Sequence, residues 1–334
     1  MEEGVGPVTT VLRSVLDMYK DAAVAVVGCH AAGTQRESCE LDVVVVTDET
    51  RPYSAVKFGN RFFDLYFVTR KEALNPADAE VAMSLARAKP VRDADLVLST
   101  SLVSNQAMMS GNSKKCASLR LASCLKALAR TEESLIEERI RAANYWLLSA
   151  SYDFARSWLY GQESIPSPSH MLKQLKEHSK GSSMNLEAFL RGAGLQRSSR
   201  RECAARLEAV SVVYDIIGSH RTGDCAFEPF VSETSCQVVK AKAAQMAEAM
   251  EHAESYSFLG SEVVRVLLAV ARAGRQQADR ADDGVDVADV LSEGEHGLLG
   301  DSLVHDLGLQ RSKIEVEGAL TTIRGQVAKL ARRV

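Results

Sequence analysis

The first hundred residues carry short runs of β-branched and aromatic side chains, each bounded by turn-forming residues. Runs of this length and composition are typical of strands, whereas helices need longer periodic segments. Apolar residues at helical spacing precede these runs and return after Asp78. The predicted elements are a helix over residues 8–20, strands over residues 22–27, 41–47 and 61–68, a helix after residue 78 and a weak last strand over residues 95–99.

From residue 114 onward, strand patterns almost disappear and apolar residues recur every three or four positions, as they do on the helices of a bundle. The pattern over residues 136–159 has two neighbouring apolar stripes, which predicts a central helix that ends at Gly161. Further helical patterns cover residues 203–217, 239–253 and 316–330, and the polar, acidic residues 274–297 predict a loop.

These patterns predict an α+β fold in two domains. Residues 1–100 form a small mixed-sheet domain with helices on one side of the sheet. Residues 114–334 form an all-α helical bundle. The Ser-, Asn- and Gly-rich residues 100–113 between them are predicted to be a linker.

Composition narrows the class of protein. The chain has 334 residues, 46% of them hydrophobic, which is enough for two domain cores. The formal net charge of −4 provides no global basic field for nucleic acid or anionic lipid. The N-terminus lacks a signal pattern and no apolar run approaches the roughly 20 residues of a membrane span. We expect a cytoplasmic protein with its 7 scattered cysteines reduced, and monomer and homodimer both stay open.

Two acids stand where a buried strand begins. Four consecutive valines, Val43 to Val46, predict a strand buried on both faces, yet Glu40 and Asp42 stand at its entrance. Side chains two residues apart on a strand point to the same side, so the two carboxylates are presented together. Like charges this close repel, and a divalent cation between them removes the repulsion; hard oxygen ligands suit Mg²⁺. The alternative is a pair of solvated acids at an exposed strand entrance.

Two further features extend this site. Asp64 interrupts the aromatic run over residues 61–68, and if that strand lies beside the 41–47 strand, the three carboxylates converge on one metal or on two that share Asp42. Gly28 ends the first strand and Cys29 follows. Glycine lets backbone N–H groups approach a phosphate, and the start of a helical turn adds partial positive charge. The alternative for Cys29 is a small buried residue.

This arrangement resembles the polymerase-beta-like nucleotidyltransferase superfamily over about residues 20–100. The resemblance rests on a strand followed by glycine and a small residue, then a gap of ten residues, then acid–apolar–acid–apolar (ELDV) and apolar–acid–apolar (FDL). The segment RIRAANYWLLSASYDFARSWLYGQESIPSP, residues 139–168, resembles the helical substrate domain of small prokaryotic nucleotidyltransferases of the kanamycin-nucleotidyltransferase and HEPN-like type.

The resemblance implies a two-metal mechanism. Mg²⁺ ions held by Glu40, Asp42 and Asp64 would orient an NTP, for which we expect ATP, and support attack on its α-phosphate with pyrophosphate leaving. Gly28 and Cys29 would contact the β and γ phosphates. The acceptor implied is a hydroxyl of a small molecule or of a protein, and a membrane or nucleic acid partner is not expected.

Three positions depart from the family pattern. Cys29 stands where a serine is usual, Glu40 replaces the commoner Asp, and Ala32 lies where many relatives have an arginine. A thiol is a weaker hydrogen-bond donor than a hydroxyl. These departures keep a second function open, a catalytically weak nucleotide-binding regulatory protein of the same fold.

The predicted bundle offers two weaker candidates. Asp153 is a candidate general base, and the alternative is a structural partner of Arg156 or Arg141. Tyr145, Tyr152 and Trp158 have helical spacing, which favours core packing over a platform for a nucleobase. No histidine follows an arginine at the four-to-six-residue spacing of HEPN ribonucleases, which argues against RNA cleavage.

Overall fold

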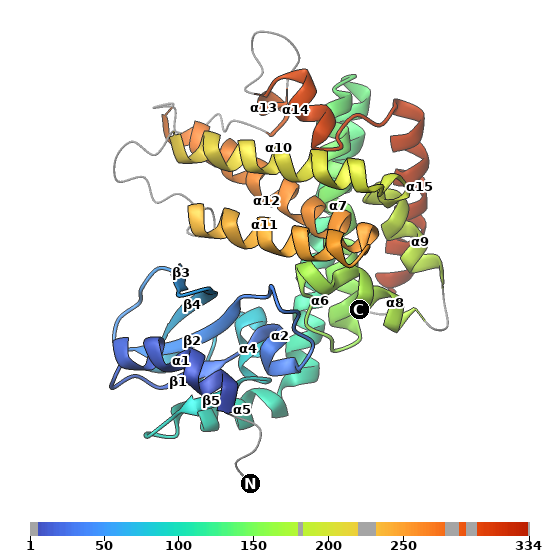
Figure 1. Cartoon of the computed structure of the whole chain (residues 1–334). Coiled ribbons are helices and arrows are strands. Elements are labelled where there is room, and N and C mark those ends of the chain that lie inside the picture. Colours follow the sequence, from blue (N-terminus) through green and yellow to red (C-terminus); the bar gives the residue numbers. More distant parts are fainter. Residues whose placement is uncertain (1–5, 180–182, 220–231, 278–286, 292–298, 333–334) are drawn as a thin grey trace. The chain divides into compact units, whose positions relative to one another are not determined.

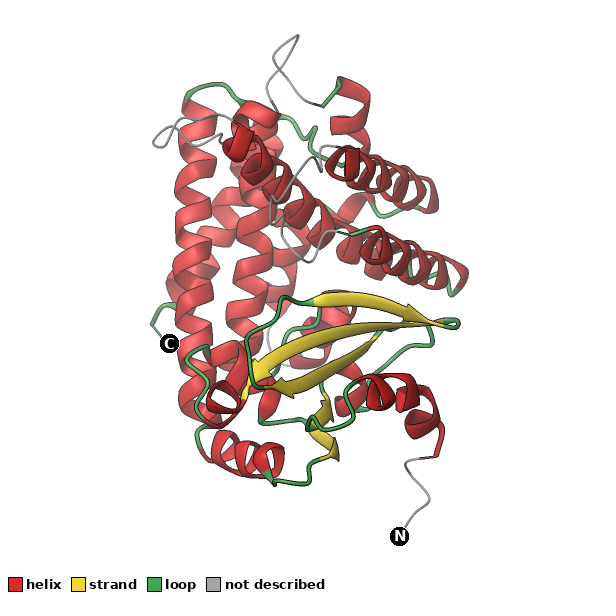
Figure 2. Cartoon of the chain, turned by 90° about the vertical axis from the view of Figure 1, so that its left-hand side faces the viewer, coloured by secondary structure: helices red, strands yellow, loops and turns green. Residues whose placement is uncertain are grey.

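The chain divides into two compact units, Met1–Lys115 and Cys116–Val334. The computed structural model describes residues 6–179, 183–219, 232–277, 287–291 and 299–332. Within those ranges, all the strands belong to the first unit and the second unit is helical (Figures 1 and 2). The α+β class predicted from the sequence, a mixed sheet followed by helices, is confirmed.

The first unit is built on one five-stranded sheet in the order β3-β4-β2-β1-β5. The central pair β2 and β4 is parallel, and the other neighbours are antiparallel, so the sheet is mixed. Its elements are α1 Gly6–Met18, β1 Val24–Val26, α2 Gly28–Ala32, β2 Leu41–Thr47, β3 Ser54–Phe58, β4 Arg61–Thr69, α3 Arg70–Leu74, α4 Ala79–Leu85, β5 Lys89–Arg92 and α5 Val97–Ala107.

Helices cover both faces of this sheet, so the expectation of helices on one side only is wrong. Val43 and Val45 of β2 pack with Leu12 and Val15 of α1 in one core. Val44 packs with residues of α3, α4 and α5 in a second core. The reason is that successive side chains of a strand point to opposite faces, so burial of the consecutive valines requires cover on both.

The stretch from residue 89 to residue 113 also differs from the prediction. The last strand is β5, an edge strand paired with β1, and residues 95–99 do not form it. The predicted linker over residues 100–113 is helical, in α5 and the start of the next helix. Its polar residues are satisfied by the fold, because buried Ser101 donates from Oγ to Ala73 O at 2.6 Å and buried Asn105 donates from Nδ2 to Ser101 O at 2.9 Å.

The second unit is a helical bundle with one large core. The predicted central helix starts at Ile140 rather than residue 136, because Ile136 ends the preceding helix. The helices predicted over residues 203–217 and 316–330 are confirmed, whereas the 239–253 pattern spans two helices. The elements are α6 Met109–Ile136, which begins in the first unit, α7 Ile140–Gly161, η1 Pro168–His170, α8 Met171–His178, α9 Ser183–Gly192, η2 Leu195–Arg197, α10 Arg200–Ser219, α11 Glu233–Glu248, α12 His252–Gln277, α13 Val287–Val290, α14 Asp301–Asp306 and α15 Lys313–Leu330.

Helix α7 is central to this unit, as its two apolar stripes predicted, since it contacts α8, α9, α12 and α15. Helices α10, α11 and α12 pack against one another (Figure 1). The predicted loop over residues 274–297 is wrong at residues 274–277, which belong to α12, and at 287–290, which form α13. Residues 278–286 and 292–297 of that prediction lie outside the described residues.

The two longest helices, α6 with 28 residues and α12 with 26, exceed the roughly 20 residues that a membrane span needs. Their charged residues make them too polar for that environment. In the part of the chain that the structure describes, no helix combines the length and the apolar character required to cross a bilayer.

Candidate active site

Three acids converge on one face of the sheet. Asp42 lies in β2 and Asp64 in β4, and the parallel register pairs these two residues directly, so their side chains leave the same face. Glu40 immediately precedes β2. One carboxylate oxygen from each of the three lies within 4.8 Å of the others, and all three side chains are half-buried. The geometry expected from the sequence is confirmed, and we call Glu40, Asp42 and Asp64 the acid cluster.

Gly28 lies against the acid cluster. Its backbone has φ +65°, and an added Cβ would meet Asp42 Oδ2 at 2.1 Å. The chain is held there because Val27 donates its backbone N–H to Asp42 O at 2.9 Å. Both the left-handed backbone and the close approach therefore require glycine. The sequence placed Gly28 in this site, and the structure brings it into contact with Asp42.

Two tyrosines that the sequence analysis missed contact the acid cluster. Tyr53, just before β3, donates its hydroxyl hydrogen to Asp64 Oδ1 at 2.6 Å. Tyr66 of β4 lies two residues after Asp64 on the same face, and its hydroxyl donates to Asp42 Oδ1 at 3.5 Å. The two rings also contact each other, with centroids 5.3 Å apart. In the sequence, the two-residue spacing from Asp64 to Tyr66 is the pattern that indicates that Tyr66 lies on the same face of the strand.

The hydroxyl of Tyr66 stays protonated. Burial raises the pKa of Tyr66 well above its ordinary value, and the negative charges of Asp42 and Asp64 raise it further. A protonated phenol can only donate to the carboxylate beside it, which favours the ionised acid. Tyr53 and Tyr66 thus fix the orientation of two members of the acid cluster without neutralising their charge.

Cys29 is half-buried beside a second cysteine. Its sulfur lies within 4.8 Å of the sulfur of buried Cys39. A hydrogen bond to Cys39 raises the pKa of the Cys29 thiol, and burial and the charges of Asp42 and Glu40 raise it further. Cys39 in turn accepts the backbone N–H of Arg36 at 3.3 Å. Cys29 is therefore a neutral thiol whose hydrogen-bonding partner is another thiol.

Asp153, the candidate general base of the helical unit, lies between two arginines. Asp153 has a 13% exposed side chain, and its Oδ1 lies 3.6 Å from Arg156 Nη1 and 3.7 Å from Arg120 Nη1. The alternative of a structural partner to Arg156 is thus observed, whereas Arg141 pairs with Asp301 instead. A role of Asp153 as general base stays a prediction.

The aromatic residues of α7 pack in the core, as their spacing favoured. Tyr145, Tyr152 and Trp158 are all buried. Tyr145 donates its hydroxyl to Val264 O at 3.3 Å and Tyr152 donates to Ser257 O. Burial raises the pKa of Tyr152 to about 12. These side chains are part of the core of the bundle rather than of a nucleobase-binding surface.

No family model matches the sequence, and neither does any curated protein. Among solved structures, the chain is similar to the crystal structure, at 1.90 Å resolution, of a nucleotidyltransferase-like protein from Exiguobacterium sibiricum 255-15. The match covers 82% of this chain and 81% of that chain, with 9% sequence identity and a TM-score of 0.35. A similarity at this level carries no argument about family or activity, so the case for a function rests on the acid cluster.

Proposed function

We propose that the chain is a metal-dependent nucleotidyltransferase, which moves a nucleoside monophosphate from an NTP to a hydroxyl of a small molecule or a protein. The observation that carries the proposal is the convergence of Glu40, Asp42 and Asp64 beside Gly28. ATP is the nucleotide that we propose as donor, with Mg²⁺ as the metal.

The donor set fits a hard divalent cation. Three half-buried carboxylates within 4.8 Å of one another concentrate negative charge on one face of the sheet. A cation that is shared among them offsets their mutual repulsion, and oxygen ligands of this kind are those that Mg²⁺ prefers. Glu40, Asp42 and Asp64 would hold the metal. Its chemistry when bound is to neutralise phosphate charge and to favour attack at phosphorus.

The glycine beside the acid cluster suits a nucleotide. Because an added Cβ at Gly28 would overlap Asp42, this position presents only backbone to the site. A bare backbone segment lets a phosphate approach the metal ligands closely. Cys29 offers a thiol at the next position, which is a weak donor to phosphate oxygens. We propose that Gly28 and Cys29 contact the β and γ phosphates.

The proposed reaction forms one bond to phosphorus and breaks another. The acceptor hydroxyl oxygen forms a bond to the α-phosphorus, and the bond from that phosphorus to the oxygen bridging toward the β-phosphorus breaks. Pyrophosphate takes the electron pair of the broken bond and leaves. The hydroxyl proton passes to a base or to water. In this scheme the chain's own residues position the reactants, with Tyr53 and Tyr66 holding the carboxylates of Asp64 and Asp42 in place.

A second function, nucleotide binding without efficient transfer, is favoured by one observation. The Cys29 thiol is hydrogen-bonded to Cys39, and the pKa of Cys29 is raised above its ordinary value. A thiol engaged in this way contributes little to holding a triphosphate. Under this alternative the chain would bind an NTP as a regulatory protein and release no pyrophosphate.

The experiment that tests the proposal is incubation of the purified chain with each α-labelled NTP, Mg²⁺ and a panel of hydroxyl acceptors. We expect label transfer and an equal amount of pyrophosphate. Binding of Mn²⁺ to the chain, followed by paramagnetic resonance, gives a readout that does not depend on turnover.

The matched control is Asp48→Asn, an exposed acid just after β2, against Asp42→Asn within the acid cluster. Loss of Mn²⁺ binding in Asp42→Asn alone supports the site. NTP binding without pyrophosphate from any mixture would favour the regulatory alternative, and absence of both NTP and Mn²⁺ binding would refute both functions.

A further inference from the structure

One hydroxyl of the chain lies where the proposed reaction needs an acceptor. Tyr53 donates its hydroxyl hydrogen to Asp64 Oδ1, and the two oxygens are 2.6 Å apart. A base that takes the proton of an attacking hydroxyl has to lie within about 2.6–3.2 Å of the hydroxyl oxygen. The carboxylate of Asp64 therefore already holds a phenol at the distance that proton transfer requires.

The proposed phosphate side of the acid cluster and this hydroxyl lie on different strands. Gly28 follows β1 and contacts Asp42. Tyr53 precedes β3 and contacts Asp64. The sheet order β3-β4-β2-β1-β5 places both acids between them, with Asp42 on β2 and Asp64 on β4. Attacking and leaving oxygens lie roughly in line across the phosphorus, so a triphosphate over Gly28 would be open to attack from the side of Tyr53.

Tyr66, the second tyrosine of the site, is less suited to attack. Its hydroxyl lies 3.5 Å from Asp42 Oδ1, which is too far for a strong hydrogen bond. Its backbone belongs to β4 and pairs with β2 at this position. Tyr53 is half-buried and lies outside the helices and strands, in the residues between β2 and β3. The Tyr53 side chain can therefore move toward a bound phosphate without disruption of the sheet.

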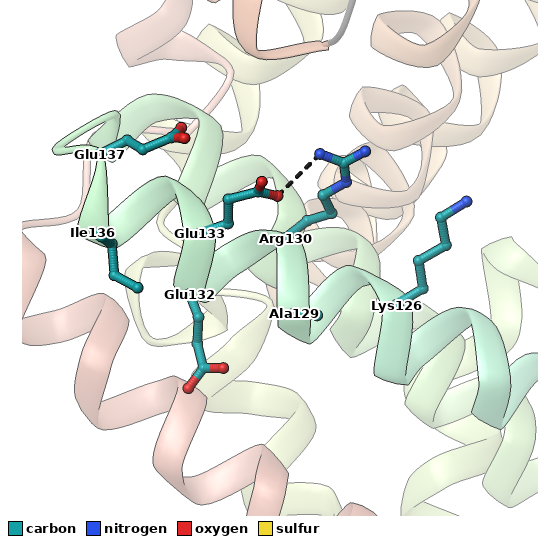
Figure 3. A pocket seen from close by; sticks show the side chains of 7 residues that line it. All are labelled: Lys126, Ala129, Arg130, Glu132, Glu133, Ile136 and Glu137. Atoms are coloured by element: carbon teal, nitrogen blue, oxygen red, sulfur yellow. Dashed lines mark hydrogen bonds and ion pairs between the residues drawn. The ribbon is translucent and has the colours of Figure 1, made fainter.

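The hollow in Figure 3 offers no competing hydroxyl. It has a volume of about 480 Å³ and lies on helix α6 of the second unit. Seven residues line it, and none of them is a serine, threonine or tyrosine. Two of them, Arg130 and Glu133, form an ion pair with each other at 2.9 Å (Figure 3). Tyr53 thus has no counterpart there.

We propose that Tyr53 is an acceptor for the nucleotidyl transfer proposed above, on which this step rests, so that the chain modifies itself. The phenolic oxygen of Tyr53 forms a bond to the α-phosphorus of ATP, and the bond from that phosphorus to the oxygen bridging toward the β-phosphorus breaks. Pyrophosphate leaves with the electron pair of the broken bond. The phenolic proton passes along the existing hydrogen bond to Asp64 Oδ1. The product is a phosphodiester that links AMP to Tyr53.

The first test is incubation of the purified chain with Mg²⁺ and ATP labelled at the α-phosphate, without an added acceptor. We expect label on the chain and an equal amount of pyrophosphate. Because Tyr53 has a single hydroxyl, incorporation should stop at one AMP per chain, and peptide mass spectrometry should locate it on Tyr53. ATP labelled at the γ-phosphate should leave the chain unlabelled, because that phosphate leaves with pyrophosphate.

The second test removes the attacking oxygen. Tyr53→Phe should abolish labelling of the chain, and its binding of Mn²⁺ verifies that the metal site is still formed. The matched control is Tyr19→Phe, a half-buried tyrosine of the same unit whose ring contacts Phe67 in the core on the opposite face of the sheet. The control should be labelled like the wild type. The rate per chain should not depend on chain concentration, because the hydroxyl and the acid cluster belong to the same chain.

The outcomes separate this inference from the function on which it rests. Label on added acceptors with an unlabelled chain overturns self-modification and leaves the proposed function standing. AMP on a residue other than Tyr53, label retained by Tyr53→Phe, or a rate proportional to chain concentration overturns self-modification as well. Absence of label from the chain and from every acceptor overturns both.

Discussion

The acid cluster of the first unit and the single carboxylate of Asp153 in the second unit show opposite ways of accommodating negative charge. In the first unit, the acid cluster gathers three carboxylates, and two of them accept hydrogen bonds from tyrosine hydroxyls. In the second unit, Asp153 lies between the guanidinium groups of Arg120 and Arg156. Asp153 is the more deeply placed of the ion pair partners, at 13% exposed against 29% and 28%.

The difference indicates which acids belong to the fold and which to a site. Arg120 and Arg156 supply positive charge next to Asp153. Removal of the Asp153 carboxylate therefore takes a negatively charged partner away from two partly buried arginines. At the acid cluster, the tyrosines orient the carboxylates and leave their summed charge in place. Substitution there should affect binding of a cation more than stability, whereas substitution at Asp153 should do the reverse.

The largest expected effect is on turnover. If the proposed reaction uses a metal between Asp42 and Asp64, Asp42→Asn should lower the transfer rate on the order of 10³-fold, since it removes the shared ligand. Asp64→Asn should lower it somewhat less. Steady-state pyrophosphate release measures both, with Asp48→Asn as control. A rate for Asp42→Asn equal to that of the control would remove the acid cluster from catalysis.

The next largest effect should be on stability, where substitutions of Asp153 and of Asp42 should differ. Asp153→Ala should lower the free energy of unfolding by about 2 kcal/mol, because it removes the carboxylate that contacts both Arg120 and Arg156. Asp42→Asn should leave the stability of the metal-free chain unchanged or slightly raised, because one of several clustered anions is gone. Urea unfolding in the presence of EDTA measures both. Equal losses in the two variants would contradict the contrast between the acids.

Bound Mg²⁺ should then change how the stabilities of these two variants compare with that of the wild type. With Mg²⁺ at a hundred times its dissociation constant, the wild type should gain about 2.7 kcal/mol of stability through selective binding to the native state. Asp42→Asn should gain much less, and Asp153→Ala should gain as much as the wild type. Thermal unfolding with Mg²⁺ and with EDTA provides the measurement. A gain in Asp42→Asn as large as that of the wild type would place the ion elsewhere.

A smaller effect should distinguish the two tyrosines. Tyr53→Phe removes a 2.6 Å hydrogen bond to Asp64 and should cost about 1 kcal/mol of stability and weaken Mn²⁺ binding a few-fold. Tyr66→Phe removes a contact of 3.5 Å to Asp42 and should cost less. Unfolding in urea and titration with Mn²⁺ test the order. The reverse order would show that Tyr66 is the main positioning residue.

The smallest expected effect concerns Cys29. Cys29→Ser replaces a thiol by a stronger hydrogen-bond donor of similar size, so NTP affinity should stay equal or rise about twofold if this residue contacts phosphate. Isothermal titration with a non-hydrolysable ATP analogue measures it. A clear loss of affinity would assign Cys29 a structural role through Cys39.

Much of the site could be predicted because it lies on strands with strong patterns. The valines of β2 and the aromatic residues of β4 define both strands, and alternation then fixes the side to which Asp42 and Asp64 point. Tyr53 could not be found in this way. It contacts Asp64 only because β3 pairs with β4, and the short SAVKF pattern of β3 does not by itself predict a strand.

The elements that sequence reasoning missed depend on tertiary contacts. Residues 97–107 are rich in serine and polar side chains, which locally favour a loop. Ser101 and Asn105 are nevertheless buried, and their hydrogen bonds to Ala73 and within α5 satisfy them. The carboxylate of Asp93 accepts the backbone N–H groups of Leu98 and Ser99 at the helix start, and these hydrogen bonds contribute to lowering its pKa. No local pattern contains this information.

The parallel pairing of β2 with β4 also bears on the order of folding events. β3 and two turns separate these strands along the chain, although Asp42 and Asp64 are direct neighbours in the sheet. The two carboxylates therefore meet only after a non-local contact has formed, which is slow relative to local hairpin formation. A cation that bridges them would bind late along the folding route. It should lengthen the lifetime of the native state against unfolding and leave the refolding rate nearly unchanged.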